Sequence, residues 1–136
     1  MQTFLPYPSF LNSALVLDNR RLGKQRVETL QILNALTDPT KGWKNHPATK
    51  MWSGHIPALA AYGIAICDEW IGRGFRDTCR DKISQFAAPD FELPAWLGDS
   101  DFHRSHQSNL LRKMPDHYSQ FFPNVPDDLP YIWPTP

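Results

Sequence analysis

The sequence predicts an all-α fold, in which residues 1–136 form one compact single-domain helical bundle with an extended N-terminal arm and a proline-rich C-terminal tail. Three observations favour this fold. Apolar residues make up 41% of the 136 residues, which suffices for one core but not for two. Long segments have the period of an amphipathic helix. We find no convincing strand pattern of alternating apolar and polar residues.

The first third of the chain contains an arm and a long helix. Two prolines make residues 1–10 an extended arm. Residues 17–36 have helical periodicity, and Asp18 or Asn19 is placed to cap the start. Projected at 100° per residue, one arc collects Leu22, Val27, Leu30, Leu33 and Leu36, with Ile32 at its edge. This arc is the predicted core face of the helix.

Further helices are predicted over residues 57–70, 76–86 and 103–122, the last of them broken at its internal proline. Residues 88–101 are rich in proline and acidic residues and are predicted to form a loop. The tail after residue 122 has five prolines, so we expect it to be extended. Apolar side chains should anchor it to the body: Val125, Tyr131, Ile132 and Trp133.

Charge is balanced overall but not locally. The formal net charge is zero, so there is no global signature of nucleic-acid binding. Residues 20–50 nevertheless hold seven basic and two acidic side chains, and residues 104–113 hold three basic and none acidic. Such separated charge can form a basic groove, although a solvated charged face is the commoner explanation.

The sequence has no sign of export or of a membrane segment. Its start lacks a basic region followed by a long apolar one, and the longest apolar stretch is too short to span a bilayer. Cys67 and Cys79 do not form a disulfide framework or a zinc motif, and Cys67 is expected in the core. We therefore expect a cytoplasmic protein.

A charged stripe lies opposite the leucine arc of the first long helix, formed by Arg20, Arg21, Lys24, Glu28 and Gln31. Lys24 and Glu28 are i, i+4 neighbours. A carboxylate beside two cations stays ionised and can act as a base or stabilise positive charge. The commoner alternative is an exposed ion pair, worth about 0.3–0.5 kcal/mol.

Arg26 and Gln25 project towards the apolar arc, which is unusual for polar side chains. Arg26 is predicted either to bind a phosphate or carboxylate, or to tie the helix to Asp127 or Asp128 in the tail. In the loop that follows the helix, Lys44 is a candidate phosphate contact and His46 a candidate catalytic residue.

The segment FHRSHQSNLLRK has the densest set of polar side chains. His103, His106 and Asn109 lie roughly along one side of the predicted helix, near Arg112 and Lys113. We interpret this face, with Ser105, as a surface that binds the nucleic-acid backbone. The alternative is an ordinary polar helix face. A metal site is not predicted, because no acidic ligand sits at helical spacing behind the two histidines.

Four segments, in order, resemble the pyrimidine-dimer DNA glycosylases of the phage endonuclease V type and their bacterial relatives. They are LDNRRLGKQRVE, KGWKNHP, AYGIAICDEWIGRGF and LLRKMPDHY. The resemblance implies an all-helical enzyme that extrudes a base from damaged duplex DNA, with no metal or other cofactor. It also implies nucleophilic attack by an N-terminal α-amine, and an acid–base glutamate on the helix.

Position by position, the resemblance assigns the glutamate to Glu28. The family's phage member uses a threonine exposed by methionine removal, whereas Gln2 is a large residue that should leave Met1 in place. The nucleophile is therefore the Met1 amine or Lys24, unless lyase activity has been lost. Arg21 is expected to contact phosphate or sugar.

Three functions follow from these patterns. The first is a DNA glycosylase and abasic-site lyase that acts as a monomer on duplex DNA. The second is a helical module that binds DNA or RNA through the same basic faces without catalysis. The third is an enzyme for a small nucleotide or modified base, whose pocket is lined by His46, His103 and His106.

Overall fold

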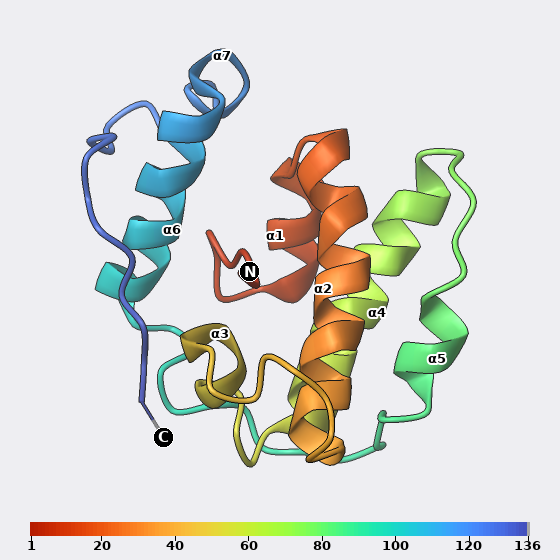
Figure 1. Cartoon of the computed structure of the whole chain (residues 1–136). Helices are drawn as coiled ribbons and strands as arrows, with labels where there is room; N and C mark the ends of the chain where they lie inside the picture. Colours follow the sequence, from red (N-terminus) through yellow and green to blue (C-terminus); the bar gives the residue numbers. More distant parts are fainter. Residues whose placement is uncertain (136) are drawn as a thin grey trace.

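A computed structural model of the chain describes residues 1–135, and within this range the fold has seven α-helices and no strand. The predicted all-helical fold is confirmed (Figure 1). In chain order the helices are α1 (Phe10–Val16), α2 (Asn19–Thr37), α3 (Pro47–Lys50), α4 (Ile56–Gly72), α5 (Arg80–Ser84), α6 (Ser100–Lys113) and α7 (Pro115–Tyr118). In the described residues, no helix is long and apolar enough to cross a bilayer.

Helices α2 and α4 pack side by side at the centre of one half of the molecule (Figure 1). The close approach depends on Gly63 of α4. A Cβ atom built there would lie 2.7 Å from Cγ2 of Thr29 and 3.0 Å from Cγ2 of Ile83, closer than carbon atoms normally approach. The absence of a side chain at residue 63 therefore lets α4 contact both α2 and α5.

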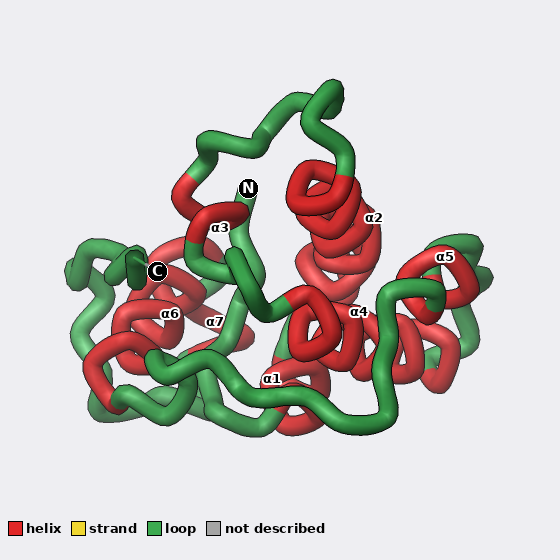
Figure 2. The backbone as a smooth tube through the Cα atoms, turned by 90° about the horizontal axis from the view of Figure 1, so that it is seen from below, coloured by secondary structure: helices red, strands yellow, loops and turns green. Residues whose placement is uncertain are grey.

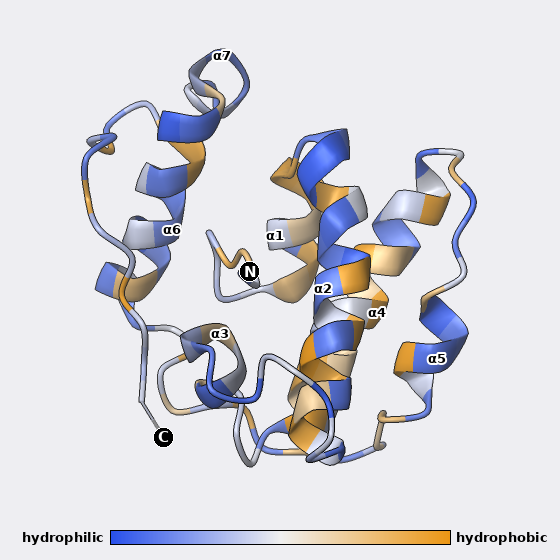
Figure 3. Cartoon of the chain, viewed as in Figure 1, coloured by the Kyte–Doolittle hydropathy of each residue, from blue (hydrophilic) through white to orange (hydrophobic). Residues whose placement is uncertain are grey.

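Most of the predicted core face of α2 is correct, with one exception. Leu22, Ile32 and Leu33 are fully buried, and Leu30 and Leu36 are partly buried against the core. Hydrophobic and hydrophilic residues occupy different parts of the α2 ribbon (Figure 3). Val27, however, is 45% exposed, which corrects its predicted place in the core. It lies at one edge of the projected arc.

Local capping explains where the helix boundaries differ from the prediction. The arm ends at Ser9, whose hydroxyl accepts from the N–H of Asn12 and so begins α1, a helix that the sequence pattern did not predict. Asp18 caps α2 by accepting from the N–H of Arg21, as one of the two predicted caps. Asp99 caps α6, which therefore begins inside the predicted loop.

The remaining boundaries also shift. Helix α4 extends slightly beyond its predicted ends, and α5 is shorter than predicted. A short helix that the sequence analysis did not predict, α3, follows His46, because Pro47 suits a first helical turn. The predicted break at Pro115 is confirmed, since α6 ends at Lys113 and α7 begins at Pro115.

The N-terminal segment before α1 runs between α2 and α6, and its residues 2–6 are buried (Figure 2). Its backbone groups are paired on both sides, as buried polar groups require. The N–H of Phe4 donates to Oε1 of Gln25 on α2 at 2.8 Å. The N–H of Leu5 donates to Nδ1 of His106 on α6 at 2.9 Å, and Nδ1 of His103 lies 2.8 Å from the carbonyl oxygen of Leu5. The arm is thus an internal element of the fold.

The C-terminal tail lies extended along α6 (Figure 1). The N–H of Leu129 donates to the hydroxyl of Ser108 at 2.9 Å, and Nδ2 of Asn109 donates to the carbonyl of Leu129 at 3.0 Å. Val125, Tyr131 and Trp133 pack against the core as predicted. Ile132 is 40% exposed, so its predicted anchoring role is wrong. Pro136, the last residue of the predicted tail and domain, lies outside the described residues.

Stability should fall in acid because of His106. Burial, together with a smaller contribution from the neighbouring His103, lowers the pKa of His106 to about 3. Since the unfolded chain takes up this proton near pH 6.5 and the folded chain does not, unfolding becomes easier as the pH falls from about 6.5 towards 3. We expect a loss of about 1.4 kcal/mol per pH unit from this group alone.

Denaturant unfolding at pH 7, 6, 5 and 4 measures this dependence. His106→Asn keeps an acceptor for the Leu5 N–H and should give a shallower loss, although it starts from a lower stability. His55→Asn is the matched control, since His55 is half-buried and makes no capping side-chain hydrogen bond. Equal slopes for the native protein and His106→Asn would contradict the assignment.

Candidate active site

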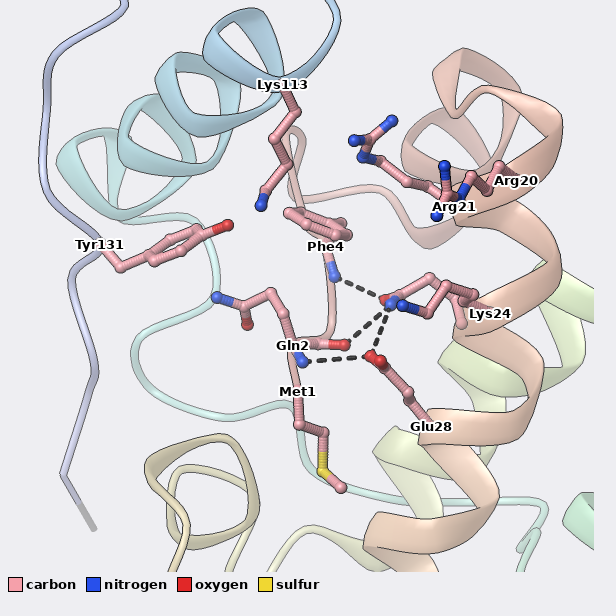
Figure 4. Close-up of a pocket in the computed structure, with 10 residues that line it drawn as sticks. Met1, Gln2, Phe4, Arg20, Arg21, Lys24, Glu28, Lys113 and Tyr131 are labelled. Carbon is pink, nitrogen blue, oxygen red and sulfur yellow. Dashed lines mark hydrogen bonds between the residues drawn. The ribbon is translucent and has the colours of Figure 1, made fainter.

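A cavity of about 350 Å³ opens between α2, the N-terminal segment, the end of α6 and the C-terminal tail (Figure 4). This volume falls within the range of about 300–1,000 Å³ that is typical of small-molecule sites. The cavity is lined by Met1, Gln2, Phe4, Arg20, Arg21, Lys24, Gln25, Glu28, Lys113 and Tyr131. It therefore brings the charged stripe of α2 together with the first residues of the chain.

Glu28 is the only acidic side chain in this lining, and its carboxylate is fixed in place. Its Oε2 accepts from the backbone N–H of Gln2 at 3.2 Å and from Nε2 of Gln25 at 3.1 Å. Gln25 lies one helical turn before Glu28, which places both side chains on the same side of α2. The carboxylate thus faces the backbone of the N-terminal segment rather than open solvent.

Gln25 is in turn held by buried partners, which explains why a polar residue occupies the apolar arc. It is 1% exposed, its Oε1 accepts from the Tyr62 hydroxyl at 2.7 Å, and its Nε2 donates to the carbonyl of Gln2 at 2.8 Å. A hydrogen-bonded chain therefore runs from Tyr62 of α4 through Gln25 to Glu28. Such a chain restricts the orientation of the carboxylate.

The N-terminal ammonium group and the Glu28 carboxylate both influence the pKa of His46. Burial lowers the pKa of His46, the N-terminal ammonium group lowers it further, and the carboxylate of Glu28 opposes both. The neutral ring has one lone pair, on Nδ1, and that atom already accepts from the N–H of Ala48 at 3.0 Å. His46 therefore caps α3 with the lone pair that a base would need, and a catalytic role for His46 remains a prediction.

Four cationic side chains surround the carboxylate in the lining: Arg20, Arg21, Lys24 and Lys113 (Figure 4). Arg21 is tied to Asp18 by an ion pair of 3.2 Å. Lys24 and Lys113 are exposed, and among residues 1–135 neither belongs to an ion pair. The i, i+4 pair of Lys24 with Glu28 is likewise absent there. The cavity mouth is thus positive and suits an anion such as a phosphate.

Arg26 does not line this cavity. Both predicted roles, a bound phosphate or carboxylate and a tie to Asp127 or Asp128, are therefore corrected by the contacts that it makes. Its Nη1 donates to Asp77 at 2.7 Å, and its guanidinium lies 4.4 Å from the ring centroid of Trp70. The partner is therefore Asp77 rather than Asp127 or Asp128. With its charge paired and its side chain 14% exposed, Arg26 ties α2 to the segment before α5.

The polar face of α6 is internal, so its predicted contact with nucleic acid is wrong for most of its residues. His103, His106 and Asn109 are at most 4% exposed and hold the N-terminal segment and the tail. Arg112 is exposed, but its guanidinium donates to the carbonyl of Asp127 at 2.5 Å. The periodicity identified one polar face correctly, but could not reveal that buried backbone segments cover it. Only Lys113 reaches the cavity.

Lys44 lies apart from the cavity lining, in the exposed loop between α2 and α3. The same loop holds Trp43, which is 55% exposed and has a φ of 73°, a conformation rare for a large side chain. A DNA contact by Lys44 remains a prediction. Within residues 1–135, no group of three or more His, Cys, Asp or Glu side chains is placed to hold a metal ion.

Sequence reasoning missed Gln2, Phe4 and Tyr131 as lining residues. Their positions depend on where the arm and the tail pack, which no local pattern encodes. The one available signal was Gln25, a polar residue on an apolar arc, since such a residue needs a buried partner. That partner is the N-terminal segment itself.

Comparison with protein families gives a match to the model described as pyrimidine dimer DNA glycosylase, over residues 1–83. The match includes α1 to α4 and most of the cavity lining, but ends before Lys113 and Tyr131. No curated protein and no solved structure matches the chain.

Proposed function

The chain belongs to the pyrimidine dimer DNA glycosylase family, and from that membership we propose that it excises damaged bases at the cavity beside Glu28, with the Met1 α-amine as nucleophile. DNA is the substrate that the family implies. The finer assignments are a monomer that binds a duplex with one extruded nucleotide, and chemistry that needs no metal or other cofactor.

One observation carries the assignment of the reacting groups. The Glu28 carboxylate accepts from the N–H of Gln2, so it lies one residue from the start of the chain and in the same cavity as Met1. A nucleophile and a proton-transfer group must be close to the same reacting atom. Lys24 also lines the cavity, but it extends from the exposed side of α2, whereas the backbone of Gln2 is bonded directly to the carboxylate.

The proposed reaction starts when the amine attacks C1′ of the damaged nucleotide. A nitrogen–carbon bond forms, the bond from C1′ to the base breaks, and the electron pair leaves with the base. A proton then passes from the attacking nitrogen to the ring oxygen O4′ as the bond from C1′ to O4′ breaks, which leaves a protonated Schiff base. Removal of a proton from C2′ expels the 3′ phosphate and nicks the strand. Glu28 is the group placed to transfer protons between these atoms.

The cations at the mouth have a separate role in this proposal. Base extrusion turns the backbone of the nucleotide towards the protein, so its phosphates need fixed positive partners. Arg20, Arg21 and Lys24 follow one another along α2, and Lys113 faces them from α6 (Figure 4). We expect these side chains to hold the flanking phosphates, and binding to weaken with added salt.

Incubation with ultraviolet-irradiated duplex DNA tests the function. The protein should cleave a bond between base and C1′ at the pyrimidine dimers and nick the irradiated strand, and should leave an unirradiated duplex intact. Binding without base release or nicking would instead support a helical module without catalysis. Activity on free nucleotides but not on duplex DNA would support the third function.

A further inference from the structure

The amide of Gln2 is a hydrogen-bond donor in the cavity that no protein group uses. The side chain is 5% exposed, and among residues 1–135 its Nε2 finds no hydrogen-bond partner. Its Oε1 accepts from the N–H of Thr3 at 2.9 Å, which fixes the orientation of the amide. A buried donor without a partner costs free energy, and such groups in native structures call for an explanation.

The direction in which the Gln2 amide points indicates which kind of ligand group it can bind. Gln2 lines the cavity, and its amide points away from the cations of α2 towards Tyr131 on the C-terminal tail (Figure 4). On that side lies the ring of Tyr131, whose centroid is 6.5 Å from that of Phe4. This part of the cavity offers aromatic surfaces and one neutral N–H donor, and the cation Lys113 lines the same cavity. A neutral donor beside aromatic surfaces suits a nucleobase with an acceptor.

We propose that the Gln2 amide binds the O2 carbonyl of the pyrimidine whose bond to C1′ is cleaved and stabilises it as a leaving group. This proposal rests on the proposed function. O2 is attached to the carbon next to N1, the atom joined to C1′. When the bond from N1 to C1′ breaks, its electron pair passes to N1 and is shared with O2. A fixed N–H on the residue next to the nucleophile therefore meets charge that develops in the transition state.

The bound base would relieve the unpaired donor. Because Nε2 is buried, the entering base must shift the half-buried Tyr131 ring, which the extended tail carries across the same cavity. Gln2 would then use each of its polar groups at once. Its N–H holds the Glu28 carboxylate, its Oε1 holds Thr3, and its Nε2 holds the base.

The test compares base excision, which involves the damaged base, with nicking and binding of abasic DNA, which do not. Single-turnover base excision is measured on duplex DNA with one thymine dimer, and nicking and affinity are measured on a duplex with an abasic site. Gln2→Met removes the donor and keeps a large residue after Met1. We expect the ratio of excision to abasic nicking to fall by about 10²-fold, as for loss of one transition-state donor, whatever smaller loss both rates share because Thr3 loses its acceptor.

Two further variants make the result specific. Gln2→Glu keeps the acceptor for Thr3 but loses the donor, so the ratio of excision to abasic nicking should fall as well. Thr3→Val is the matched control, because it removes the oxygen that accepts from Trp52 at 3.0 Å and disturbs the arm without touching the base. It should lower both rates together and leave their ratio unchanged.

Some results would overturn the proposal. Normal excision by Gln2→Met, or equal losses on dimer and abasic DNA, would remove Gln2 from leaving-group stabilisation. Excision by the unaltered protein without abasic nicking would overturn only the amine chemistry, and abasic affinity would then serve as the reference. Absence of excision by the unaltered protein would overturn the proposed function, and this proposal with it.

Discussion

Glu28→Gln should lower both base excision and strand nicking by about 10²–10⁴-fold, the usual contribution of a positioned acid–base group. The substituted amide keeps an oxygen that can accept from the N–H of Gln2, so the arm should stay in place. What is lost is the ability to take and return a proton. Single-turnover rates on dimer-containing duplex measure the effect.

The matched control for this change is Asp68→Asn, the same carboxylate-to-amide substitution at a surface site of α4. Asp68 is 54% exposed and pairs with Arg80, far from the lining of the cavity. We expect it to leave both rates unchanged, since exposed pairs contribute little. If Glu28→Gln retained full activity while binding DNA normally, Glu28 would have no acid–base role.

Extending the chain by residues placed before Met1 should abolish strand nicking. The extension converts the α-amine into a peptide nitrogen, which is not a nucleophile. It also moves the new amine by about 3.3–3.6 Å per added residue, away from the Glu28 carboxylate. The rate of nicking of abasic duplex measures the loss. The mass of the unextended protein must first confirm that its chain begins at Met1.

The same extension at the C-terminus is the control, and it should leave nicking intact. Affinity for abasic DNA reports whether the extended arm still allows the duplex to bind. Full nicking by the N-terminally extended protein would exclude the Met1 amine and direct attention to Lys24, the other amine in the cavity lining. Lys24→Arg would then be the variant that loses activity.

The sequence predicted those parts of the site that depend on one helix. Glu28, Lys24 and Arg21 share a side of α2 because of helical spacing, and the structure places all three at one cavity. Gln25 was recognised as unusual for the same reason. The resemblance to the glycosylase family agrees with the family match over residues 1–83.

The parts that depend on chain packing could not be predicted in this way. The face of α6 that carries His103, His106 and Asn109 has the composition of a polar surface, yet two extended segments cover it and use its hydrogen bonds. The sequence of an extended segment has no periodicity that indicates which helix it packs against. For the same reason, Gln2 and Tyr131 were not identified as neighbours of Glu28.

The central claim is that the amine at the start of the chain reacts beside Glu28, and borohydride trapping tests it most directly. Borohydride reduces the Schiff base formed on abasic duplex DNA to a stable amine, and mass spectrometry of the digested adduct locates the modified residue. We predict one covalent adduct, on the α-nitrogen of Met1. An adduct on Lys24, or nicking of the abasic strand with no adduct, would contradict the claim.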